Sequence, residues 1–190
     1  MKETLTALAL AAAALATLPG CIPLAITAGA GTAVLMAGDR RTTGMYIEDE
    51  NIELKILGIK DRFKGAHVNG TSFNRHVLLT GEAPDEATRS RIEADVRAIP
   101  NVKEVTDEIQ VAGSSSLASR GSDALITSNV KARMVNNPRF AANHVKVVTE
   151  AGTVYLMGLV TPEEGDAAVD IARTTSGVVR VVKVFEYIGK

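Results

Sequence analysis

Few side chains in this sequence could carry out chemistry. It contains one cysteine, Cys21, and three histidines, His67, His76 and His144. The histidines lie far apart in the sequence, and no two have the spacing of zinc ligands with a carboxylate or a second histidine nearby. The serines at 114–116 have no evident base partner, which a nucleophilic serine needs. We therefore expect no enzymatic activity, no metal site and no cofactor.

The cysteine thiol suggests a different chemistry, the attachment of acyl chains. Met1 to Gly20 is typical of a bacterial export signal, with Lys2 before a run of Ala, Leu and Thr that is too short to span a bilayer comfortably. Gly20 and Cys21 at the end of this run resemble a lipobox, the cleavage site of lipoproteins. Cleavage would leave an acylated Cys21 as the first residue, and each buried CH₂ contributes about 0.8 kcal/mol to anchoring. The alternative is a small buried cysteine without a role.

Residues 21–45 are expected to form a lipidated tether between this anchor and the folded part. Ile22 stands where an inner-membrane retention signal would have Asp, so we expect a lipoprotein of the outer membrane that faces the periplasm. The segment from Ile22 to Gly38 is apolar, but it is interrupted by Pro23, Gly29 and Gly31. Pro19, Gly20 and Pro23 each disfavour helix, which argues against one long transmembrane helix through signal and tether.

The rest of the chain contains an internal repeat with a spacing of 77 residues. Segments 67–81 and 144–158 are identical at five of fifteen positions, and the identities include a histidine at the start and a glycine at the end. β-branched residues on both sides of Glu150-Ala151-Gly152 predict a β-hairpin in the second copy. Thr161, followed by proline and by Glu164 three positions later, predicts a capped helix after that hairpin.

Each copy is therefore expected to fold as helix, strand, strand, helix, strand. This is an α+β unit in which two helices cover one face of a three-stranded mixed sheet. The apolar stripe of the second helix is expected at Ile92, Val96 and Ile99 in the first copy, and at Ala168, Ile171, Ala172 and Thr175 in the second. We expect Gly70 to interrupt the first strand of the first copy, because glycine weakens strands.

Composition sets the boundaries of these units. After a signal peptide at residues 1–20, we place the first module at 46–112 and the second at 122–190. A Gly/Ser linker at 113–121 joins them. The linker composition leaves open whether the modules move independently or pack together.

These features together resemble the BON domain, and a tandem pair behind a lipobox resembles the dual BON-domain outer-membrane lipoproteins. The most specific stretches are Val154 to Thr161, Asp170 to Ala172, and Ser176-Gly177-Val178. The resemblance implies two BON domains and no enzymatic activity. It also implies phospholipid contact through the first helix of the second domain, and a role in envelope integrity.

The distribution of charge favours a lipid-facing role for the second copy. The first copy has thirteen acidic and nine basic residues, whereas the second is close to neutral. No Asp or Glu occurs from Ala124 to Thr149, and this window contains Lys131, Arg133, Arg139 and Lys146. Each cation near an anionic bilayer contributes about 1 kcal/mol to binding. A helix from about Asp123 to Val135 would suit such a surface.

We expect this helix to contact anionic phospholipid, with phosphatidylglycerol and cardiolipin as the natural candidates. Lys131 and Arg133 would supply the charge and Leu125 the apolar contact. The complete set of expected contact residues is Leu125, Ser128, Lys131, Ala132, Arg133, Met134 and Val135. The alternative is that Ile126, Val130 and Met134 form the core-facing stripe that any helix covering a sheet requires.

Two functions remain open from the sequence. The first is a non-enzymatic lipoprotein of the outer membrane that binds anionic phospholipid through the second module and helps maintain membrane integrity. The second is an adaptor for envelope protein partners, in outer-membrane protein assembly or in cell-wall remodelling at division. Its partner surface would lie on the acidic first module, around Glu48 to Glu53 or Arg89 to Arg97. The net charge of −1 gives no footprint for nucleic acid.

Overall fold

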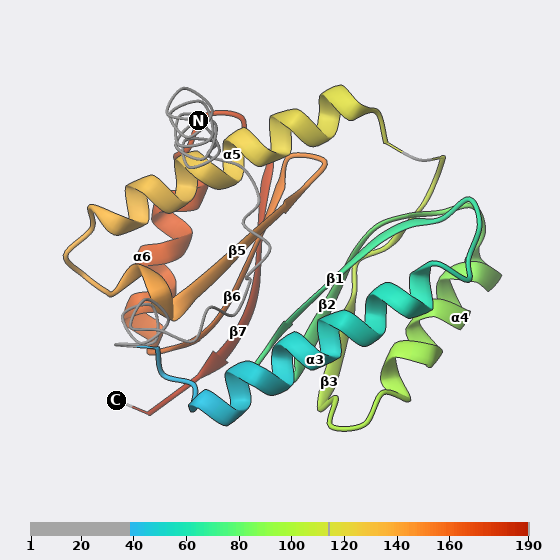
Figure 1. Ribbon diagram of the computed structural model, residues 1–190. Coiled ribbons are helices and arrows are strands. Elements are labelled where there is room, and N and C mark those ends of the chain that lie inside the picture. The colour runs from blue at the N-terminus through green and yellow to red at the C-terminus, as the bar shows by residue number, and fades with distance from the viewer. Residues whose placement is uncertain (1–38, 114, 190) are drawn as a thin grey trace, which may run out of the picture. The chain divides into compact units, whose positions relative to one another are not determined.

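The computed structural model describes residues 39–113 and 115–189. Cys21, the expected signal peptide and most of the expected tether lie outside the described residues. The described part consists of two modules with the same order of helices and strands (Figure 1). The α+β fold expected from the sequence is confirmed.

The first module begins with α3 (Thr43–Lys60), followed by the hairpin of β1 (His67–Phe73) and β2 (His76–Ala83). Helix α4 (Glu86–Arg97) leads to two short strands, β3 (Glu104–Asp107) and β4 (Gln110–Val111). β1 pairs with β2 in antiparallel fashion, whereas β3 and β4 both pair with β2 in parallel. The sheet is therefore mixed, and β2 is its central strand.

The second module repeats this order, with one long last strand in place of the two short ones. It consists of α5 (Leu117–Val135), the short 3₁₀ helix η2 (Ala142–His144), the hairpin of β5 (Val145–Glu150) and β6 (Thr153–Val160), α6 (Pro162–Arg173) and β7 (Arg180–Tyr187). β5 and β6 are antiparallel, and β7 pairs in parallel with β6. The predicted capping box of α6 is present, because Thr161 and Glu164 each bond to the other's backbone N–H.

Three local expectations were wrong. Helix α5 begins at Leu117 rather than near Asp123, because the Ser116 side chain caps it by accepting a hydrogen bond from the Ser119 N–H. Helix α3 likewise begins at Thr43, inside the segment assigned to the tether. Strand β1 continues through Gly70, where a Cβ would lie 2.6 Å from the side chain of Ile56. Glycine stands there because Ile56 packs against the backbone, not because the strand breaks.

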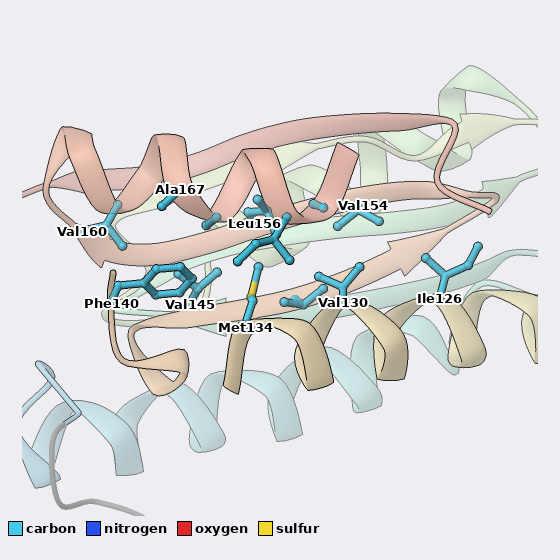
Figure 2. Packing of buried hydrophobic residues seen from close by; sticks show 13 residues of the cluster. Ile126, Val130, Met134, Phe140, Val145, Val154, Leu156, Val160 and Ala167 are labelled. Carbon is cyan, nitrogen blue, oxygen red and sulfur yellow. The ribbon is translucent and has the colours of Figure 1, made fainter. Parts of the chain in front are cut away.

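Each module has its own hydrophobic core between helices and sheet. The predicted stripes Ile92, Val96 and Ile99 on and just after α4, and Ala168, Ile171, Ala172 and Thr175 on and just after α6, are all buried. In the second module Ile126, Val130 and Met134 of α5 meet Val154 and Leu156 of β6 (Figure 2). Burying a side chain of this size contributes about 1.5–3 kcal/mol. These cores fix which side of each helix faces outward.

A third apolar cluster joins the two modules. It consists of Phe73, Leu78, Tyr155, Met157, Leu159 and Val184. Polar contacts border it: Lys146 Nζ donates to Glu53 Oε1 at 2.7 Å, and Asn74 Nδ2 donates to Glu186 Oε2 at 2.8 Å. β2 and β6 are buried along nearly their whole length, since helices cover one face and this cluster the other. The modules therefore pack together, which the composition of the linker left open.

The segment that enters the fold from the N-terminal side contacts both modules. Arg40 Nη1 donates to the carbonyl oxygen of Leu159 at 2.8 Å, and its Nη2 donates to Glu164 Oε1 at 2.8 Å. Arg41 Nη1 donates to Asp49 Oδ2 at 2.9 Å, and its guanidinium lies 4.1 Å from the centre of the Phe73 ring. Two adjacent arginines are thus bound to different modules.

Candidate membrane-contact surface

Helix α5 is oriented by three side chains on its inner face. Ile126, Val130 and Met134 are at most 8% exposed. Because positions three and four apart share one face of a helix, burying these three turns the opposite face outward. The outward face carries Leu125, which is 68% exposed.

The outward face combines apolar and small side chains. Val135 is 71% exposed, and Ser128 and Ala132 are exposed between it and Leu125. Leu125, Ser128, Ala132 and Val135 follow one another at spacings of three or four residues, so they form one ridge along the helix. Four of the expected contact residues therefore lie together on the surface.

The outward face of α5 carries no acidic side chain. The one acid in the α5 sequence is Asp123, which is 6% exposed and turned toward the sheet. Its Oδ2 accepts from the Ala151 N–H at 2.9 Å, and its Oδ1 accepts from the Gly152 N–H at 2.8 Å. The carboxylate is used to hold the β5–β6 turn, and it does not oppose an anionic surface.

Lys131 and Arg133 lie on opposite flanks of the ridge. The chain of Lys131 is exposed, but burial of its ammonium group lowers its pKa, and nearby Lys146 lowers it further. The ammonium is adjacent to a cavity of about 360 Å³ that Asp39 and Glu50 also line. Lys131 forms no ion pair with another described residue, so it is the cation of α5 most available to an external anion.

The guanidinium of Arg133 is committed to the protein. Its Nη1 donates to the carbonyl oxygen of Ile171 at 2.8 Å and to Thr175 Oγ1 at 2.6 Å, and its Nη2 donates to Thr174 Oγ1 at 2.9 Å. These acceptors lie at the end of α6, where a cation is favourable. Arg133 contributes positive charge to the surface, but its hydrogen bonds are largely occupied.

Met134 is placed differently from the other expected contact residues. It is 1% exposed, and its side chain lies in the core of the second module (Figure 2). Including Met134 among the contacts was wrong, because the same helical period that exposes Leu125 turns Met134 inward. The alternative of a core-facing stripe is correct for this residue.

Two features of the repeat were not found from the sequence. The first is a buried aspartate on the first helix of each module: Asp49 accepts from the N–H groups of Asn74 and Arg75, as Asp123 does from the corresponding turn. The two aspartates are separated by 74 residues, whereas the equivalent strands are separated by 77. An alignment of the copies at the strand spacing therefore does not match Asp49 with Asp123. The second is a set of exposed apolar residues on α3, Ile47, Leu54 and Leu57.

Within residues 39–113 and 115–189, no three His, Cys, Asp or Glu side chains are grouped so that they could hold a metal ion. The three histidines lie apart on β1, β2 and η2. In the same part of the chain, no helix combines the length and the apolar character needed to cross a membrane.

The structure thus defines a tandem pair of helix-strand-strand-helix-strand modules with a basic, partly apolar helix on the second. The BON domain model matches residues 49–113 and 122–189, and the chain belongs to this family. The sequence is 37% identical to the outer membrane lipoprotein DolP of Haemophilus influenzae over 175 residues, which cover 90% of each chain. The expected membership of the dual BON-domain lipoproteins is confirmed.

Two further relatives are more distant. A 21 kDa hemolysin of Actinobacillus pleuropneumoniae is 31% identical over 154 residues, which cover 79% of each chain. Osmotically-inducible protein Y of Escherichia coli is 27% identical over 141 residues, which cover 71% of this chain and 70% of that protein. The first relative is an outer-membrane lipoprotein by name, and that is the localisation expected from the sequence.

Proposed function

We propose that the second BON domain binds anionic phospholipid through the ridge Leu125, Ser128, Ala132 and Val135 of α5, flanked by Lys131 and Arg133. The protein would be a non-enzymatic lipoprotein that helps maintain the integrity of the outer membrane. The observation that carries this proposal is a helix that exposes two large apolar side chains and no acidic one. Phosphatidylglycerol and cardiolipin are the lipids we expect it to prefer.

The magnitudes indicate a weak contact that depends on anchoring. Lys131 contributes about 1 kcal/mol near an anionic surface, and inserting the exposed part of Leu125 contributes about 1–2 kcal/mol. A total of about 3 kcal/mol corresponds to a dissociation constant above the millimolar range. An acylated Cys21 would make the contact intramolecular and raise the effective concentration of lipid, so that a weak surface suffices.

The test is a titration of the chain lacking residues 1–21 with vesicles of phosphatidylglycerol, cardiolipin or neutral phosphatidylcholine, followed by backbone amide NMR shifts. We expect shifts on α5 with the anionic vesicles alone, reduced by salt. Lys131→Glu should weaken them, whereas Lys64→Glu, on an exposed lysine of the first domain, should not. Undiminished binding by Leu125→Asp combined with Lys131→Glu would show that this surface is not the site.

Arg133→Glu is a poor test of the same proposal. Because its guanidinium holds three acceptors at the end of α6, the substitution would lower the stability of the domain as well as its charge. Arg133→Lys keeps the charge and removes most of these hydrogen bonds. A lipid contact that depends on charge alone should therefore survive Arg133→Lys.

The adaptor function is the second candidate, and a different observation favours it. The first domain is acidic, and α3 exposes apolar side chains. Such a surface suits a protein partner better than an anionic bilayer, because the carboxylates of Glu48 and Glu50 would oppose the lipid headgroups. Crosslinking from α3 to one dominant envelope protein in cells would support an adaptor.

A further inference from the structure

Helix α3 is apolar on two opposite faces. Ile52, Ile56 and Ile59 are buried against the sheet of the first domain. On the outward side Ile47, Leu54 and Leu57 are 54%, 63% and 47% exposed. A helix that covers one sheet needs only one apolar stripe, so the outward set is unexplained by the fold. Single exposed apolar residues are ordinary, but three on one helix mark a contact surface.

The outward residues form a continuous ridge. Ile47, Asn51, Leu54 and Gly58 follow one another at spacings of four, three and four residues, which places them in one line along α3. We call these four residues the outer ridge. Large and small side chains alternate along it, and a Cβ at Gly58 would meet nothing within 4 Å. The ridge therefore offers two protruding side chains and an open hollow.

We propose that the occupant of the outer ridge is α3 of a second copy of this chain, packed antiparallel about a two-fold axis. The register is set by the level of the axis along α3. If that level lies midway between residues 52 and 53, Ile47 of each copy meets the hollow at Gly58 of the other. In the same register Leu54 of each copy packs against Asn51 and Leu54 of the other. Such an interface is self-complementary, as a two-fold contact must be.

The charges on the flank of the ridge support this register. A two-fold axis that runs between the two helices, perpendicular to both, keeps each flank opposite the same flank of the second copy. Lys55 and Glu48 share one flank, and in this register Lys55 of each copy lies near Glu48 of the other. Glu48 Oε1 accepts from Asn101 Nδ2 at 3.1 Å, which holds the carboxylate in place. Lys55 is exposed and forms no ion pair with another described residue.

The small size of the contact predicts a weak dimer, which forms where the protein is concentrated. α3 has 18 residues and is about 27 Å long, so one pair of such helices buries less than the roughly 1,200 Å² of a standard stable interface. The pair should be weak in dilute solution. Anchored copies are concentrated in one membrane plane, which raises the dimer population without any new contact. The experiment therefore uses the full chain in the envelope of its host.

The test is disulfide formation from a single cysteine beside the two-fold axis. Asn51→Cys introduces it without removing Ile47 or Leu54, and Ser90→Cys on α4 is the matched control at an exposed helical position. The unsubstituted chain, whose one cysteine is Cys21, gives the background. With a mild oxidant, we expect a disulfide-linked homodimer from Asn51→Cys at several times the yield from Ser90→Cys.

Exchanging the charges at positions 48 and 55 distinguishes a second copy of this chain from any other protein partner. In the Asn51→Cys chain, Lys55→Glu and Glu48→Lys should each reduce the homodimer yield severalfold, and the two together should restore it. Three results would overturn the proposal: equal yields from the cysteines at 51 and 90, no restoration by the double exchange, or a crosslinked product whose mass is that of a different protein. Vesicle binding through α5 involves none of these residues, so either proposal can fail without the other.

Discussion

Removing the carboxylate of Asp123 should destabilise the second domain more than any surface substitution. The two oxygens accept the N–H groups of Ala151 and Gly152 at 2.9 and 2.8 Å, and the side chain is 6% exposed. A hydrogen bond to a charged group contributes about 1.5–3 kcal/mol, and removing the carboxylate loses both of these bonds. Ala151 also has a φ of +48°, a conformation that costs a non-glycine residue about 1–2 kcal/mol and that these bonds help hold.

Asp123→Ala should therefore lower the free energy of unfolding by about 3–5 kcal/mol. Asp123→Asn retains one acceptor oxygen and should lose about half as much. Urea denaturation with linear extrapolation measures both, and Asp170→Ala is the matched control, because Asp170 is half-exposed and pairs with Arg173 on the surface. A loss below about 1 kcal/mol for Asp123→Ala, or one equal to that of Asp170→Ala, would refute the reasoning that the turn depends on this carboxylate.

Two further substitutions test other parts of the structure. Gly81→Ala and Gly158→Ala should each destabilise by about 2–4 kcal/mol, because the new Cβ would lie 2.0 Å from the His67 carbonyl oxygen and 2.4 Å from that of His144. The larger effect is expected at Gly81, whose φ is +107°, and Gly113→Ala, with open space around it, should change the thermal midpoint little. Burial raises the pKa of Glu150, so the stability contributed by its neutral form is complete below the ordinary value of 4.5 and is lost as pH rises through the raised pKa. Glu150→Gln should thus stabilise at pH 7 and have little effect near pH 4, and equal effects at both pH values in urea denaturation would contradict this.

Much of the fold could be predicted because repeated local patterns determine it. The 77-residue spacing identified equivalent hairpins, and the Thr161–Glu164 capping box identified the start of α6. Gly81 and Gly158 then have one physical explanation, since in each case a histidine carbonyl oxygen at or just before the start of the neighbouring strand lies too close for a side chain. A repeat thus predicts structure well when the same steric constraint acts twice.

The contact surface was only partly predictable. Helical period placed Leu125 on the outward side, where it is exposed, but the expected contact set also included Met134, which is buried. Charge type favoured Arg133 as much as Lys131, and only the structure shows that the acceptors at the end of α6 occupy Arg133. The contacts between the domains involve residues from distant parts of the chain, such as Phe73 and Tyr155, and no local pattern reveals them.

The two neighbouring arginines at the start of the fold have a mechanical consequence. Arg40 is bonded to the second domain and Arg41 to the first, so tension applied to the chain ahead of them would be shared by both. A pull from a membrane anchor would then load the seam between the domains before it could unwind α3. Under tension from a membrane anchor, such a protein would resist with both domains together and would not unfold one domain at a time.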